Sequence, residues 1–462
     1  MTVPLPRGWI RTTLGEIARP RREMAAARSN GGRYLGLEHV EARTTKILGC
    51  GDGTNIKGSG VKFQTGDTLY ARLRPYLNKV CIPDFGGVAS GEFIVLPAVD
   101  WLAPKFMMYF LNQPDLVAFA NARSTGTHRP RIKWDDLSPY PVLLPPLAEQ
   151  RRIVAVIEEQ FSRIAAGVEA LQRARRNLQR MRAAVLQAAV TGRLTQRKPS
   201  DGPAAQLLKS LGIDESRATE QVLPLLKLPD HWVMALLGWI AETRLGKMLS
   251  KAAKTGVKPK PYLRNLNVQW WRFDLSDVAT MNIDDDERER FSLRPGDLMV
   301  CEGGYVGRCA VWRGQTEDCY YQKALHRVRA RLGVAAEYLA VVLRHYAENR
   351  LLGQFITGTT IEHLPQEDLR NLPIPLPPTA EQHRIVAEVN RQFSLLDDVD
   401  GAIETSLNRA ERVRRAVLQE AFRGRLTPQD QSDKPAFVPL DHIKTVRAVP
   451  VPVAMPGRRS RR

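Results

Sequence analysis

Two long stretches of the chain carry the same spacing of apolar residues. In each stretch the apolar positions recur in steps of three and four against a charged background, which is the period of an α-helix with one narrow apolar face. The first stripe consists of Ile153, Ile157, Phe161, Ile164, Val168, Leu171, Leu178, Met181 and Val185. The second consists of Ile385, Val389, Phe393, Leu396, Val399, Ile403, Leu407, Val413 and Val417. Since such a stripe is unstable in water, each stretch predicts a long helix packed against a partner.

The two stretches are copies of one another. Residues 145–195 align with residues 377–427 at a constant offset of 232, and 24 of the 51 positions are identical. Each copy opens with Pro-Pro, which suits a helix entry, and Gly192 and Gly424 suit the helix ends. About 43 residues with a rise of 1.5 Å predict a rod of roughly 60 Å. The simplest partner for one rod is the other, and a pseudo-twofold repeat makes them antiparallel.

Each helix copy follows a region of mixed character. Short apolar runs at 91–99 and 326–332 predict strands, and the segments 105–113 and 337–349 predict helices. The mixed regions also echo one another: "LPRGW" at 5–9 recurs as "LPDHW" at 228–232, and "TGTHRPRIKWDDL" at 125–137 as "TGTTIEHLPQEDL" at 357–369.

The predicted fold class is therefore α+β, with two pseudo-symmetric mixed α/β domains separated by two long antiparallel coiled-coil helices. The predicted segments are a first domain at 1–144, a helix at 145–195, a linker at 196–227, a second domain at 228–376, a second helix at 377–427 and a disordered basic tail at 428–462.

The charge of the chain points toward a polyanion. Lys and Arg total 68 against 49 Asp and Glu, which gives a net charge of +19 and a pI near 9.9. The excess lies mainly in the first half, with +7 in residues 1–144 and +5 in 145–195. Residues 228–376 carry only +2, but the segment 244–261 holds six basic residues and no acid. That segment is interpreted either as a DNA-contacting loop or as a solvated Lys-rich loop.

The sequence contains no recognisable catalytic motif and no metal-binding motif. The sequence has no phosphate-binding loop, no methyltransferase cofactor loop or Asn/Asp-Pro-Pro-Tyr/Phe tetrad, and no histidines at metal-ligand spacing. The five cysteines form no CxxC pair and are expected to be small buried residues in a reducing cytoplasm. The N-terminus lacks the apolar run of a signal peptide, and no window is long enough to span a membrane. The chain is therefore expected to be a cytoplasmic recognition protein with no bound metal.

The repeated "PP.AEQ.RIVA" (145–155 and 377–387) and "VLQ…GRLT" (185–195 and 417–427) resemble the DNA-specificity subunit of type I restriction-modification enzymes. The resemblance runs from Leu5 to Thr427. It implies two target-recognition domains that each read one half of a bipartite site in double-stranded DNA, with helices that set the spacer. It also implies a complex with two methyltransferase subunits and with motor-nuclease subunits, and adenine-N6 methylation or restriction as the result. No cofactor is expected on this chain, because S-adenosylmethionine, ATP and Mg²⁺ belong to those partners.

Basic and aromatic residues in predicted loops are the candidates for DNA contact. In the first domain they are Arg72, Arg74, Tyr76, Lys79, His128, Arg129, Arg131 and Lys133. In the second domain they are Lys247, Lys251, Tyr305, Arg308, Thr359 and His363. Each contacts either a base or, more commonly, a phosphate.

The repeated helix entries are candidates for docking the methyltransferase subunits. The residues are Ala148, Glu149, Gln150 and Arg152 in the first copy and Ala380, Glu381, Gln382 and Arg384 in the second. The alternative is that they only begin and cap the helix. Two other functions compete with the specificity subunit: a self-sufficient methyltransferase or nuclease with drifted motifs, and a coiled-coil scaffold that does not bind DNA.

Overall fold

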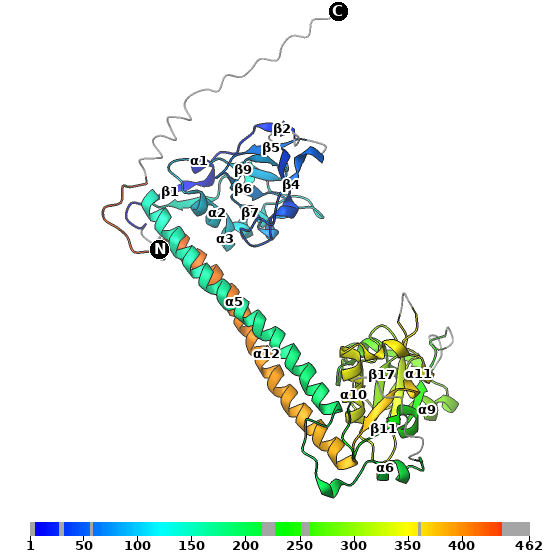
Figure 1. The fold of residues 1–462 in the computed structure, drawn as a ribbon. Coiled ribbons are helices and arrows are strands. Elements are labelled where there is room, and N and C mark those ends of the chain that lie inside the picture. Colours follow the sequence, from blue (N-terminus) through cyan, green and yellow to red (C-terminus); the bar gives the residue numbers. More distant parts are fainter. Residues whose placement is uncertain are drawn as a thin grey trace, which may run out of the picture. The chain divides into compact units, whose positions relative to one another are not determined.

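The computed structural model describes residues 5–26, 32–55, 59–214, 227–250, 253, 258–358 and 362–436. The chain divides into two compact units, residues 1–171 with 405–462 and residues 172–404. We call them unit 1 and unit 2. Each unit contains one of the mixed regions together with one end of each long helix (Figure 1).

The two repeated segments form the longest helices. Helix α5 (Leu147–Val190) and helix α12 (Thr379–Phe422) have 44 residues each, and their bounds differ by the offset of the sequence repeat. Gly192 and Gly424 follow them with φ of +69° and +71°. A β-carbon would lie 2.3 Å from Pro229 Cγ at the first glycine and 2.5 Å from Pro6 Cγ at the second. Glycine is therefore required there by both conformation and space.

Within each unit the two helices run antiparallel, as predicted. In unit 2, Arg182 pairs with Asp397 at 2.5 Å and Arg175 with Asp400 at 3.1 Å, so residue numbers fall on α12 as they rise on α5. In unit 1 the Arg414 guanidinium lies 4.1 Å from the centre of the Phe161 ring.

The apolar stripe is buried mainly toward the two ends of each helix. Ile153, Ile157, Ile385 and Val389 are fully buried. The prediction is wrong for Met181, Val399 and Val413, which are 53%, 47% and 41% exposed. Ile403, near the middle of α12, is 5% exposed, so the pair of helices covers some positions of the stripe and leaves others open to solvent.

Unit 1 is built on three sheets with strand orders β1-β10, β7-β6-β9 and β2-β5-β8-β3-β4. Its strands are β1 (Ile10–Thr13), β2 (Met24–Ala26), β3 (Arg33–Leu35), β4 (Gly51–Asp52), β5 (Ser59–Phe63), β6 (Thr68–Ala71), β7 (Val80–Cys81), β8 (Gly87–Ala89), β9 (Phe93–Leu96) and β10 (Pro141–Leu144). Its shorter helices are α1 (Leu14–Ile17), α2 (Pro104–Asn112), α3 (Pro114–Ala122) and α4 (Trp134–Leu137). The apolar core joins α2 to both long helices, and Phe106 and Phe110 contact Phe422 edge to face.

Unit 2 repeats this plan, with strand orders β11-β21, β12-β20-β17-β18, β16-β13-β19 and β14-β15. Its strands are β11 (Val233–Leu236), β12 (Ala241–Leu245), β13 (Pro259–Leu263), β14 (Val268–Gln269), β15 (Arg272–Phe273), β16 (Ala279–Asn282), β17 (Asp297–Cys301), β18 (Cys309–Val311), β19 (Tyr320–Tyr321), β20 (Leu325–Ala330) and β21 (Pro373–Leu376). Its shorter helices are α6 (Ala205–Ser210), α7 (Leu237–Ile240), α9 (Asp285–Phe291), α10 (Ala336–Glu348) and α11 (Gln366–Arg370). Strand β9 matches the predicted strand at 91–99 and β20 the one at 326–332, while α2 and α10 match the two predicted helices.

Two segments differ from their expected character. The segment expected to be a linker, 196–227, holds helix α6, whose Leu208 is fully buried. The tail was expected to be disordered from residue 428, but its first nine residues pack onto unit 1. Ala436 is 3% exposed there, and its amide donates to the Gly8 carbonyl at 3.0 Å. Residues 437–462 lie outside the described part of the chain.

Candidate nucleic-acid interface

In unit 1 the two predicted DNA-contacting segments, 72–79 and 128–133, are brought side by side. The loop between β6 and β7 forms a bridge from Leu73 to Arg131. The amide of Arg74 donates to the Pro130 carbonyl at 2.7 Å, and the amide of Ile132 donates to the Arg72 carbonyl at 3.0 Å. Segments about 55 residues apart therefore form one basic surface.

Within that surface some basic side chains are free to contact a ligand and others already have partners. Arg131 forms a fork onto the Glu92 carboxylate at 2.6–3.0 Å, and Lys79 donates to the Leu37 carbonyl at 2.7 Å. Arg72 is half-buried. The exposed candidates are Arg74, Tyr76, His128, Arg129 and Lys133.

Unit 2 repeats the arrangement with different side chains. The loop between β17 and β18 bridges from Gly303 to His363, and the amide of Leu364 donates to the Glu302 carbonyl at 2.8 Å. His363 Nδ1 lies 3.4 Å from the Glu302 carboxylate. His363 therefore occupies the place of Arg131, but its carboxylate partner Glu302 occupies the place of Arg72, and Ala324 that of Glu92.

One exposed tyrosine stands at the tip of each of these loops. Tyr76 is 41% exposed and Tyr305 is 63% exposed. Arg308 is only 8% exposed: its guanidinium lies 3.9 Å from the centre of the Tyr305 ring and donates to the Asn265 carbonyl at 2.9 Å. Arg308 thus supports Tyr305 instead of reaching outward.

Of the remaining candidates for DNA contact in unit 2, one is already paired within the unit and two are not described by the structure. Lys247 is half-buried and paired with Glu287, so its charge is already compensated within the unit. Lys251 and Thr359 lie outside the described residues.

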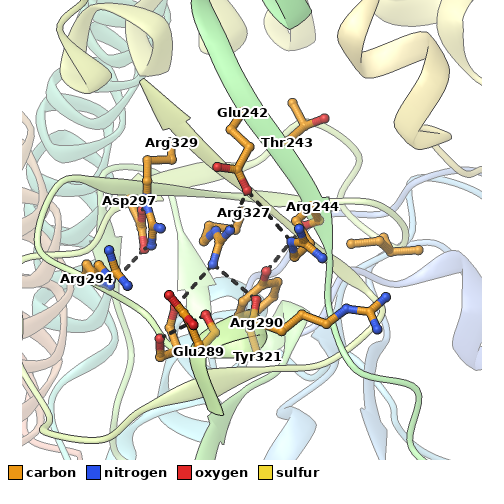
Figure 2. A network of polar contacts seen from close by, with 12 residues as sticks. Glu242, Thr243, Arg244, Glu289, Arg290, Arg294, Asp297, Tyr321, Arg327 and Arg329 are labelled. Carbon is orange, nitrogen blue, oxygen red and sulfur yellow. Dashed lines mark hydrogen bonds and ion pairs between the residues drawn. The ribbon is translucent and has the colours of Figure 1, made fainter. Parts of the chain in front are cut away.

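In unit 2, a network of polar side chains links strands of the sheet (Figure 2). Arg327 is 2% exposed and donates to the Glu242 carboxylate at 2.9 Å. Arg329 forms two bonds to Asp297 at 2.6 and 2.7 Å, and Asp297 also accepts the Arg294 amide at 2.8 Å. Both arginines have carboxylate partners, so the network holds strands β12, β20 and β17 together and does not offer charge to a ligand.

The repeated Glu-Gln pair lies at the junction between each mixed region and its helix. Glu149, Gln150, Glu381 and Gln382 are at most 1% exposed. Trp9 Nε1 donates to Glu149 at 2.9 Å, and Trp232 Nε1 donates to Glu381 at 3.2 Å. Burial raises the pKa of Glu149, and the hydrogen bond from Trp9 opposes that rise.

Each glutamine holds the same junction through hydrogen bonds to the backbone of the mixed region. Gln150 Oε1 accepts the Ala103 amide at 2.9 Å, and Gln382 Oε1 accepts the Ala335 amide at 2.8 Å. Both amide groups also donate to the proline carbonyl that precedes the helix, at 3.0 Å. The four buried side chains therefore hold the start of each helix to its own unit. Of the docking candidates, Ala148 and Ala380 are exposed.

The ion pairs of the two helix-entry arginines show that the sequence repeat continues beyond residues 195 and 427. Arg152 pairs with Asp433 at 2.5 Å, and Arg384 pairs with Asp201 at 2.5 Å. The aspartates are 232 positions apart and lie in "SDGPA" at 200–204 and "SDKPA" at 432–436. Asp201 and Asp433 were missed, although this short motif at the known offset was the signal for them.

The His, Cys, Asp and Glu side chains of the described residues bear on metal binding and on thiol reactivity. Among the described residues no three His, Cys, Asp or Glu side chains form a group that could hold a metal ion. Burial raises the pKa of Cys81 and Cys319 to about 12 and that of Cys301 to about 11, so these thiols are poor nucleophiles. Cys50 is exposed, contrary to the expectation that all five cysteines are buried. No helix among the described residues is long and apolar enough to cross a membrane.

The fold and the paired loops agree with comparisons to known proteins. Residues 229–409 match the sequence profile of the type I restriction modification DNA specificity domain. The EcoKI specificity subunit of Escherichia coli is 25% identical over 339 residues, which is 70% of this chain and 68% of that protein. The EcoDI specificity subunit of Escherichia coli is 22% identical and covers 96% of each chain.

Solved structures show the same fold. The crystal structure of the HsdS subunit from Thermoanaerobacter tengcongensis matches with a TM-score of 0.58 and 22% identity, over 92% of this chain and 99% of that one. A chain from a study of complex assembly and conformational transition of the type I R-M system matches with a TM-score of 0.65 and 21% identity, over 92% and 100%. The chain is therefore similar, over most of its length, to type I restriction-modification DNA-specificity subunits, and residues 229–409 match their DNA specificity domain.

Proposed function

We propose that this chain is the non-catalytic DNA-specificity subunit of a type I restriction-modification complex, and that each unit reads one half of a bipartite site. The observation that carries the proposal is the duplicated pair of loops, which presents an exposed tyrosine in each unit and exposed basic side chains in unit 1. Aromatic and basic side chains on loops fixed to a sheet are suited to the edges and phosphates of a duplex. The domain match over residues 229–409 and the specificity-subunit relatives support the same role.

The partners follow from this role. Two methyltransferase subunits and motor-nuclease subunits supply methylation and cleavage, and they carry S-adenosylmethionine, ATP and Mg²⁺. The exposed Ala148 and Ala380 lie at equivalent helix entries, so they offer the same contact surface twice. The buried Glu-Gln pairs contribute by fixing the orientation of that surface.

The long helices set the number of base pairs between the half-sites. Because α5 and α12 pair antiparallel within each unit, an insertion must be made in both to keep their ion pairs. Seven residues in each, within 165–180 on α5 and at the facing turn of α12, add about 10 Å. The unread spacer is then expected to lengthen by about 3 base pairs, at 3.4 Å each, with both half-sites unchanged.

The test is to express the chain with its methyltransferase partner in a methylation-free host and to map N6-methyladenine by long-read sequencing. A bipartite motif is expected, and Arg74→Ala or Tyr305→Ala should relax or weaken one half only. The matched control is Arg313→Ala, whose exposed side chain pairs with Glu337 away from the loops. Absence of any methylated motif with an active partner, or a motif with a single half, contradicts the proposal.

A further inference from the structure

Unit 1 contains a pocket beside the β6–β7 loop, and Tyr76 of that loop belongs to its lining. It has a volume of about 330 Å³ and lies between the β6–β7 loop, helix α3 and helix α12. That volume falls in the range of roughly 300–1,000 Å³ that is typical of small-molecule sites. All of its lining residues belong to unit 1.

The lining of the pocket carries uncompensated positive charge. Arg43, Arg414 and Arg415 all line it, and none forms an ion pair among the described residues. Glu411 is the acidic residue of the lining, so the charge of the lining is +2. Arg414 is held in place by the Phe161 ring, and Arg43 by its amide, which donates to the Leu77 carbonyl at 2.9 Å. Three guanidinium groups against one carboxylate leave a net positive lining, which favours a phosphate or a similar anion.

Two buried amide side chains at the same pocket lack part of their hydrogen bonding. Asn78 and Asn112 are 7% and 8% exposed, and both line the pocket. Asn78 Nδ2 donates to the Asn112 carbonyl at 3.1 Å. Asn78 Oδ1 and Asn112 Nδ2 have no partner among the described residues, at a cost of about 1–3 kcal/mol for each such buried group. Both atoms therefore belong to lining residues and have unused hydrogen-bonding capacity.

The ring of Tyr76 completes the lining. It projects from the short turn Pro75–Leu77, which is bounded by left-handed residues Arg74 and Asn78 with φ of +50° and +43°. This backbone is fixed by the bond from the Asn78 amide to the Pro75 carbonyl at 2.9 Å. A rigidly held, exposed aromatic ring next to a donor, an acceptor and cations suits a heterocyclic base joined to a phosphate.

In unit 2 two positions that correspond to lining residues of this pocket carry side chains with other partners. The position of Arg414 is taken by Arg182, which is paired with Asp397 at 2.5 Å. The position of Asn112 is taken by Arg344, whose guanidinium lies 4.6 Å from the Trp271 ring and 4.9 Å from the Phe393 ring. Both arginines are thus engaged within unit 2, and Arg182 offers a matched control.

We propose that the unit 1 pocket binds a single nucleotide unit, with its phosphate on Arg43, Arg414 and Arg415 and its base near Tyr76 and the two asparagines. The nucleotide comes either from bound nucleic acid or from free nucleotide in solution. Only the first source rests on the proposed function.

The first experiment is calorimetric titration of the full chain with the four deoxynucleoside monophosphates, with deoxyadenosine and with inorganic phosphate. At least one monophosphate is expected to bind at least tenfold more tightly than deoxyadenosine or inorganic phosphate alone. The double variant R414Q/R415Q should weaken it at least tenfold, R414K/R415K less, and R182Q not at all. Equal binding of inorganic phosphate and the monophosphates would reduce the pocket to an anion site and overturn the assignment to a nucleotide.

The second experiment measures how binding of non-specific duplex DNA depends on salt. If the nucleotide belongs to bound DNA, R414Q/R415Q should flatten the slope of log K against log[salt] by about 1, and R182Q should leave it unchanged. Circular dichroism and the unfolding midpoint verify that each variant is folded. If wild-type protein binds DNA but no probe titrates and the slope is unchanged, the pocket proposal is wrong while the specificity role stands. If a monophosphate binds but duplex DNA does not, the reverse holds.

Discussion

Replacing Gln382 by alanine tests whether the repeated Glu-Gln pair holds the helix to its unit. Gln382 is fully buried, and it satisfies the Ala335 amide at 2.8 Å and the Pro377 carbonyl at 3.0 Å. Alanine leaves the buried Ala335 N–H without a partner, which costs roughly 1–3 kcal/mol. The truncated side chain adds about 1 kcal/mol for lost packing. The expected loss in the free energy of unfolding of unit 2 is therefore about 3 kcal/mol.

Urea unfolding and hydrogen exchange measure this loss. With an m-value of roughly 2–3 kcal/mol/M, the unit 2 midpoint should fall by about 1 M. The exchange protection of the Ala335 amide should fall about 100-fold, since a tenfold change corresponds to about 1.4 kcal/mol. The control is His383→Ala, an exposed neighbour on α12, which is expected to change stability by less than about 0.5 kcal/mol. If Gln382→Ala and His383→Ala behave alike, the glutamine does not hold the junction and the reasoning fails.

Three further predictions concern other buried contacts. Burial lowers the pKa of His345 to about 4. The unfolded chain takes up a proton on this histidine near pH 6.5, but the folded chain does so only near pH 4. The free energy of unfolding is therefore at its full value above pH 6.5 and falls as the pH is lowered toward 4. Between pH 6.5 and 5 wild-type unit 2 should lose about 2 kcal/mol more than His345→Gln in parallel urea titrations, and identical pH profiles would exclude a buried neutral histidine. Asp297→Ala leaves the Arg329 guanidinium without its carboxylate partner and should lower the free energy of unfolding of unit 2 by about 3 kcal/mol. The control, Glu337→Ala, removes a surface ion pair and should cost less than about 1 kcal/mol. Equal losses for the two variants in urea unfolding would refute the role of the Asp297–Arg329 pair. Asp433→Ala should release residues 429–436 from unit 1, seen as faster amide exchange there, and unchanged exchange would mean that the ion pair does not hold this segment.

The sequence was most informative where the relevant signal is local. The spacing of apolar residues and the Pro-Pro and Gly signals predicted α5 and α12, because helix period and helix termination are set within a few residues. The internal repeat then indicated that both helices have the same length, and their bounds do share the offset of 232. The net charge indicated a polyanionic ligand but not its place, since charge alone carries no geometry.

What the tertiary structure decided is which distant residues meet. Glu149 and Glu381 look like solvated helix-entry residues in sequence, yet both are 1% exposed because the tryptophan near the start of each mixed region folds back onto them. Likewise Arg131 and Arg74 are equivalent as basic loop residues, but a carboxylate from the start of β9 compensates only the first. The repeat in the sequence determined that two similar units exist. Only long-range packing determined which of their charges form ion pairs inside each unit and which remain available to a ligand. Ion pairing depends on neighbours that are distant in the sequence and that a local pattern therefore does not predict.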